Sequence, residues 1–167
     1  MSKLVYFIEA AIRNVATVAM VLIVVVMLGI TFDIITRFSG NPVSGVIELN
    51  RLLVVILIFL SVPYAQQIRG HIDTDIVTRY YPRQKGKVVE LTMLIMSLTV
   101  FMLLCIPTYG NFVKSYTIKE YSWGSVPFVT WPTHLAIFLG LCLLNVQLVI
   151  QIGRTAIELI DLLKKNG

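Results

Sequence analysis

The sequence has few charged residues for its length, and none lies near the middle of its long apolar runs. Of its 167 residues, 14% are charged and 57% are hydrophobic, whereas an ordinary soluble domain has about 25% charged residues. A small soluble domain buries only a limited part of its chain, so it could not hide this much apolar surface. The composition therefore excludes an ordinary soluble domain and predicts a protein that lies in a lipid bilayer.

Cysteine and histidine are nearly absent, which excludes several kinds of site. The two cysteines, Cys105 and Cys142, lie inside apolar runs and form neither a CxxC pair nor a disulfide framework. The two histidines, His71 and His134, lie near the ends of apolar runs, so they cannot ligate haem at membrane depth. We expect no cofactor and no bound metal.

Motifs of enzymes are also missing. The sequence has no GxSxG, no HExxH, no phosphate-cradling loop and no suitable Cys–His pair, so we expect no catalytic residues and no enzymatic activity. The formal net charge is +5, but the basic residues lie between apolar runs. That distribution indicates charge that orients a membrane protein, and we expect no binding of nucleic acid.

Four apolar segments are long enough to cross a bilayer. A helix of about 20 apolar residues spans about 30 Å of hydrocarbon. The sequence predicts an all-α integral membrane protein with one domain over 1–167 and four transmembrane helices, at about 15–35, 46–68, 88–112 and 133–153. Pro127 and Pro132 favour a start of the last helix near Thr133.

Two amphipathic segments lie outside these spans. Lys3–Asn14 gathers apolar residues on one face and has Glu9 and Arg13 as a possible i,i+4 pair, and Arg154–Lys165 is also amphipathic. We expect short interfacial helices there, or extensions of the neighbouring spans.

The distribution of basic residues predicts the orientation. Ten of the fourteen Lys and Arg lie in the N-terminal segment, the loop between the second and third helices, and the C-terminal tail. Cytoplasmic loops carry the excess of basic residues. Both termini are therefore expected in the cytoplasm, with the loops around residues 39–45 and 114–132 on the outer side.

Four charged residues gather at the outer ends of the first two helices. Asp33 and Arg37 close the first helix at i,i+4, while Glu48 and Arg51 open the second at i,i+3. They favour ion pairs that lock the helical hairpin, and the functional alternative is a polar contact to another subunit. An ion-translocating carboxylate is disfavoured, because it would lie nearer the midplane.

Weaker polar groups lie toward the inner ends of the second and fourth helices. They are the amides Gln66, Gln67, Asn145, Gln147 and Gln151. Such amides commonly form hydrogen bonds between helices, so we favour helix packing over a substrate path. The spacing of Ala136 and Gly140 would allow a close approach of two helices.

Aromatic residues flank the predicted spans, as is usual at membrane interfaces. The second outer loop is the longer and more aromatic one, and it is the expected docking surface for a partner outside the membrane. Its candidate contact residues are Trp123, Phe128 and Trp131.

The arrangement resembles a known family of transport subunits. Arg37 is followed by the segment Gly45–Arg51, the segment Arg69–Asp75 contains a His-Ile pair and an Asp at the family's spacing, and Pro127–Pro132 precedes the last helix. In this order on four spans, these motifs resemble the small, DctQ-like membrane subunit of tripartite ATP-independent periplasmic (TRAP) transporters. Pro63 and Thr74 depart from the pattern of that family.

The resemblance implies a division of labour in the bacterial inner membrane. A periplasmic binding protein would capture an organic anion of the carboxylate or sialic acid class, and a large membrane subunit would import it with sodium. The small subunit would be a scaffold against which the large subunit moves. Arg37, Glu48, Arg51 and the outer aromatic loop would face the partners, and Arg69, His71 and Asp75 would order the inner loop.

Two other functions remain open at this point. A small homo-oligomeric exporter would need an acid inside a helix to couple protons, and a membrane-anchor subunit of a respiratory complex would carry haem or quinone. The lengths of the helices allow either a layer or a compact bundle, and we favour a layer.

Overall fold

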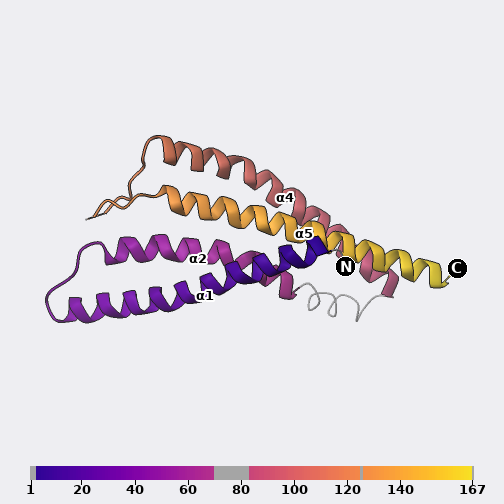
Figure 1. The fold of residues 1–167 in the computed structure, drawn as a ribbon, viewed down its shortest axis with the longest axis horizontal. Coiled ribbons are helices and arrows are strands. Elements are labelled where there is room, and N and C mark those ends of the chain that lie inside the picture. The colour runs from indigo at the N-terminus through magenta and orange to yellow at the C-terminus, as the bar shows by residue number, and fades with distance from the viewer. Residues whose placement is uncertain (1–2, 70–82, 125, 167) are drawn as a thin grey trace.

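The computed structural model describes residues 3–69, 83–124 and 126–166. Within these ranges the chain forms four helices (Figure 1), which are α1 (Lys3–Phe38), α2 (Val46–Arg69), α4 (Arg83–Thr117) and α5 (Trp131–Asn166). Each of the four is long and apolar enough to span a membrane. The prediction of an all-α protein with four candidate transmembrane helices is confirmed.

The helices are longer than a bilayer requires. Both α1 and α5 have 36 residues, which corresponds to about 54 Å at the usual rise per residue. The two amphipathic segments are therefore not separate interfacial helices. They continue α1 and α5 without a break, and no proline follows Asn14 or Gly153 within these helices to interrupt them. At its other end, α5 begins at Trp131 with Pro132 in its first turn, a position that proline tolerates.

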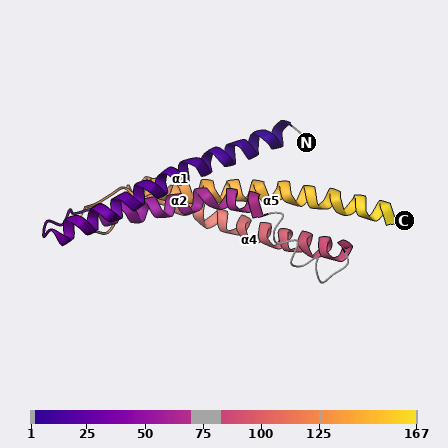
Figure 2. The ribbon, with the colours of Figure 1, turned by 90° about the horizontal axis from the view of Figure 1, so that it is seen from below.

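The four helices form an open layer. Figure 1 shows them side by side in the order α1, α2, α5 and α4, and the packing contacts run between neighbours in that order. In Figure 2 the first turns of α1 diverge on one side of α5, while α4 lies on the other side. This arrangement agrees with the expected layer and differs from a compact bundle, in which α1 would also pack against α4.

Helix α5 lies at the centre of the layer. In its most apolar window 39% of the residues are buried, against 11% in α1 and α2 and none in α4. Its buried residues recur every three or four positions, which brings them onto the helix faces that meet α2 and α4. They include Ala136, Gly140, Leu141, Leu144, Gln147, Leu148 and Gln151. Most of the side chains of α1 and α4 remain available to lipid or to another protein.

The ends of the layer differ. The start of α1, the end of α5, the end of α2 and the start of α4 lie at one end (Figure 1), which we call the terminal end. The segments 39–45 and 118–130 lie at the opposite end, which we call the hairpin end. An even number of spans places both chain termini at the same end, as the figure shows.

Candidate functional site

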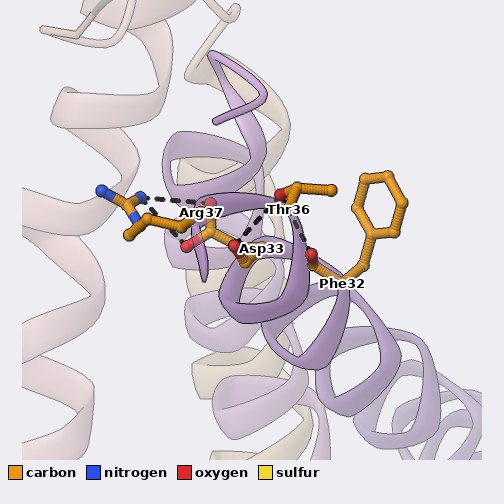
Figure 3. Close-up of polar contacts among 4 residues, drawn as sticks. All are labelled: Phe32, Asp33, Thr36 and Arg37. Atoms are coloured by element: carbon orange, nitrogen blue, oxygen red, sulfur yellow. Dashed lines mark hydrogen bonds and ion pairs between the residues drawn. The ribbon is translucent and has the colours of Figure 1, made fainter. Parts of the chain in front are cut away.

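Asp33 and Arg37 form an ion pair within α1 near the hairpin end. The Arg37 guanidinium donates hydrogen bonds of 3.1 Å to both carboxylate oxygens of Asp33 (Figure 3). The Thr36 hydroxyl donates to the carbonyls of Phe32 and Asp33, so the polar groups of this turn are bonded among themselves. The Asp33 side chain is 12% exposed and that of Arg37 is 56% exposed, which leaves the outer face of the guanidinium available to a partner.

Glu48 contacts the loop between α4 and α5. A Cβ atom added to Gly124 would overlap the Glu48 side chain, so the two residues lie in direct contact. Gly45, with a φ of 93°, adopts a backbone conformation that favours glycine, and a Cβ there would lie 2.9 Å from Val126 Cγ2 and 3.3 Å from Phe128 Cε2. The beginning of α2 therefore packs beneath the loop between α4 and α5.

This packing differs from the hairpin lock that the sequence favoured. Asp33 and Arg37 are both on α1, so their ion pair does not join two helices. Among the ion pairs described for residues 3–69, 83–124 and 126–166, none joins Glu48 to Arg51. The connection at this end is instead made by close packing of Gly45 and Glu48 against the second loop.

The second loop at the hairpin end, which joins α4 to α5, folds back on itself. Tyr121 and Val129 form an antiparallel bridge, and the Ser122 amide donates a 2.7 Å hydrogen bond to the Phe128 carbonyl. The Thr130 amide and hydroxyl both donate to the Glu120 carbonyl at 3.0 Å. These bonds join the two arms of the loop, residues 120–122 and 128–130.

The three aromatic residues predicted for docking have different surroundings. Trp123 is 96% exposed at the tip of the loop. Phe128 packs against Gly45, and the ring of Trp131 stands edge-on to that of Tyr116 at 5.8 Å between centroids. Trp123 is therefore the one of the three that is fully presented to a partner.

Amide side chains join the central helix to its neighbours. Gln66 Nε2 donates to Gln151 Oε1 at 2.9 Å, and Gln151 Nε2 donates to the Gln66 carbonyl at 2.8 Å. Asn145 Nδ2 lies 3.3 Å from the Cys105 sulfur of α4. These contacts confirm the helix-packing interpretation for Gln66, Gln151 and Asn145.

Gly140 allows a close approach between two helices. A Cβ atom added there would meet the backbone carbonyl of Phe59 in α2, so the two helices touch without an intervening side chain. Ala136, one turn earlier, is also buried. The small-residue spacing seen in the sequence thus does bring α2 and α5 together.

Charges at the terminal end form a network that the sequence analysis missed. Lys87 Nζ lies 3.0 Å from Glu90 Oε2 and 2.8 Å from Glu158 Oε2, which links α4 to α5. Arg154 donates a 2.6 Å hydrogen bond to Glu9, which links α5 to α1. Glu9 therefore pairs with Arg154 and not with Arg13, because the ion pair between helices replaces the one expected within α1.

A sequence signal existed for part of this network. Lys87 and Glu90 stand at i,i+3, a spacing that brings side chains together on a helix, but the partners from α5 follow only from the packing. The predicted site residues His71 and Asp75 lie outside the described residues, and so does the Arg69 side chain.

The described side chains offer contact surfaces and no reactive site. No group of three or more metal-ligating side chains occurs among the described residues. The exposed groups are a guanidinium, a protruding indole and broad apolar helix faces, which suit binding to lipid and to other proteins.

The chain is similar to a known family of transport components. The family model for the DctQ component of tripartite ATP-independent periplasmic transporters matches residues 26–157. No curated protein and no solved structure matches the chain. The matched range includes all of α2 and α4, most of α5, and the part of α1 that carries Asp33 and Arg37.

Proposed function

The chain belongs to the DctQ component family of TRAP transporters, and from this membership we propose that it is a scaffold for the large transporting subunit. It is a multi-pass small membrane component of such a transporter and not an enzyme. On our proposal it packs against the large subunit, holds that subunit's fixed part in place and carries no solute itself.

The open layer is the observation that supports this role best. Its central helix α5 is packed on two sides, whereas α1 and α4 keep long apolar faces uncovered. No acid or base lies near the middle of a span, and an organic anion would need polar or charged partners there. Such a layer suits a broad contact with another membrane protein better than binding of a solute.

Our proposals for the transported solute and for the coupling ion rest on family membership alone. We propose that the complete transporter imports an organic anion, of the carboxylate or sialic acid class, and that the large subunit couples this import to sodium. A periplasmic binding protein would deliver the anion. In this arrangement the chain contributes contact surfaces and leaves the choice of solute to the other two components.

We also propose the bacterial inner membrane as the location, with both termini in the cytoplasm. Ten of the fourteen Lys and Arg lie in the N-terminal segment, between the second and third spans, and in the C-terminal tail, and the positive-inside rule favours the cytoplasm for these segments. The hairpin end, with Arg37 and the loop of Trp123, would face the periplasm.

Trp123 is our candidate contact for the binding protein. It protrudes from a loop whose own hydrogen bonds fix its shape, and exposed indoles are frequent centres of binding energy at protein interfaces. Trp123→Ala should lower the affinity of the transporter for the binding protein about tenfold or more while the large subunit still co-purifies. Phe7→Ala, an exposed aromatic at the other end, is the control, and equal affinity in the two variants would contradict the assignment.

Co-purification tests the scaffold role. The tagged chain is extracted from its native membrane in mild detergent, and the proteins that accompany it are identified by mass spectrometry. We expect one much larger multi-pass partner in stoichiometric amount. Recovery of the chain alone or as a homo-oligomer would contradict the proposal and favour a small exporter, and a haem absorbance band would favour a respiratory anchor.

A further inference from the structure

A groove of about 430 Å³ lies between α1 and α2 near the hairpin end. Its apolar lining consists of Ile30, Ile47, Val54 and Val55. Its polar lining consists of Asp33, Asn50 and Arg51. The groove therefore combines an aliphatic wall with a small group of polar side chains, and neither the scaffold role nor the packing of the layer accounts for this combination.

Asn50 is a largely buried residue that lines the groove. It is only 8% exposed, and it makes no hydrogen bond within the described part of the chain. It lies against Gly29, where a Cβ atom would stand 2.6 Å from Oδ1 and 3.0 Å from Nδ2, so the absence of a side chain at Gly29 leaves room for the amide. A largely buried amide that lacks a protein partner favours a ligand that offers hydrogen-bonding atoms over a purely apolar one.

Arg51 supplies a cation at the same level. The residue is exposed, and within the ranges that the structure describes it forms no ion pair or hydrogen bond. Asp33, the acid that also lines the groove, is paired with Arg37, which donates a hydrogen bond to each of its carboxylate oxygens. The guanidinium of Arg51 is therefore available to an anion from outside the chain.

The order of these groups along the helices matches the order of groups in a phospholipid. Asn50 and Arg51 lie in the second turn of α2, and Val54 and Val55 follow about one turn deeper in the membrane. On α1, Ile30 is likewise deeper than Asp33 by about one turn. A phosphate has acceptor oxygens that suit an arginine, ester carbonyls suit an amide donor, and an acyl chain suits the aliphatic wall.

A helix from another subunit fits the groove less well. A helix with its side chains is about 10–12 Å in diameter, so it would lie across the opening and would place only a few side chains inside. An acyl chain is narrow enough to lie along the groove and cover its apolar lining.

We infer that the α1–α2 groove binds one phospholipid from the leaflet at the hairpin end. Arg51 contacts the phosphate, and the Asn50 amide donates to a phosphate or ester oxygen of the same molecule. One acyl chain lies along Val54, Val55 and Ile30. The site lies on the chain itself and does not require that the large subunit be present.

Native mass spectrometry tests the site on the full chain, together with any subunits that accompany it from the membrane. The protein is delipidated in mild detergent and then titrated with palmitoyl-oleoyl phosphatidylethanolamine or phosphatidylglycerol. We expect one lipid to remain bound at collision energies that strip the others. In the double variant Asn50→Leu, Arg51→Ala, occupancy of that lipid should fall about tenfold or more, since both headgroup contacts are lost.

The matched control is Asn14→Leu with Arg13→Ala. These are an exposed amide and arginine on α1 at the terminal end, and the retained lipid should persist in this variant. Val54→Trp is a second test that leaves the polar groups intact, because the indole fills the groove and should also displace the lipid. Gel filtration and thermal unfolding confirm that each variant is folded before it is titrated.

Three outcomes would overturn the inference. The first is that the wild-type chain retains no lipid, and the second is that the double variant retains it as well as the control does. The third is that the double variant keeps its lipid but loses the large subunit, which would make the groove a contact between proteins. Lipid binding is measured on the chain directly, so failure of the scaffold proposal would leave this result interpretable.

Discussion

At the scale of single residues, the interface between α2 and α5 depends on the absence of a side chain. Gly140 meets the backbone carbonyl of Phe59, and a carbonyl cannot rotate away as a flexible side chain can. Any added atom must therefore push the two helices apart. The nearby amide pair Gln66–Gln151 would be stretched by the same movement.

Gly140→Ala should destabilise the protein by about 1–3 kcal/mol, the usual cost of overpacking a filled interior. Gly110 on α4 is the matched control, because no atom lies within 4 Å of the position that its Cβ would take. Gly110→Ala should leave stability unchanged or slightly raised. The measurement is thermal unfolding in detergent, and an equal loss of stability in both variants would contradict the close contact at Gly140.

Sequence reasoning predicted some of these residue contacts and missed others. The spacing of Ala136 and Gly140 and the positions of the glutamines indicated helix packing, because these local patterns have few uses within a membrane. Asn50 received no role, since an amide one turn inside a span gives no sign of which helix lies opposite. The contact of Glu48 with Gly124 joins residues far apart in the sequence and follows only from the fold.

At the scale of helices, ionic contacts join α5 to both of its outer neighbours at the terminal end. Lys87 on α4 lies between Glu90 and Glu158, and Arg154 on α5 reaches Glu9 on α1. The side chain of Lys87 is 16% exposed, so its charge is only partly solvated. An ion pair that is partly shielded from water is strongly affected by the loss of one partner.

Lys87→Met should lower the unfolding temperature, because it leaves Glu90 partly buried without its cation. The cost should be about 1–3 kcal/mol, and the additional change Glu90→Gln should recover part of it by removing the unpaired charge. Lys114→Met is the control, since Lys114 lies on the same helix and is exposed. If the two lysine variants unfold at the same temperature, the proposed role of the network is wrong.

The helices themselves were predictable because each apolar run has the length of a span. The positions at which the helices end were not predictable. The expected interfacial helices are continuous with α1 and α5, since amphipathic sequence alone does not tell a helix that bends along the membrane from one that continues straight. The ion pairs of Arg154 and Lys87 provide contacts for these extensions and depend on the packing of three helices.

At the scale of the whole molecule, the layer of α1, α2, α5 and α4 leaves the two outer helices open to their surroundings. The length of the helices favoured a layer, but their order could not come from the sequence, because apolar faces of similar composition do not specify their neighbours. The order places the helix with the most buried residues in the centre. The charged groups lie toward the two ends of the helices, where solvent and headgroups can solvate them.

The proposed orientation can be measured by labelling. In a background with Cys105→Ala and Cys142→Ala, a cysteine replaces either Asn41 at the hairpin end or Lys164 at the terminal end. A membrane-impermeant maleimide should label N41C in intact spheroplasts and K164C only after permeabilisation, since the basic residues of the terminal end favour the cytoplasm. The reverse pattern would contradict the orientation.

The central claim is that the open faces of the layer contact a large transporting subunit, and crosslinking within the native membrane tests it most directly. A photoreactive amino acid is placed at Met20 or Val24 on α1 and at Met96 or Leu103 on α4, all of which are exposed. The account predicts that at least one of these two faces crosslinks to a single, much larger multi-pass protein. Crosslinks only between copies of this chain, or none to any protein from either face, would contradict it.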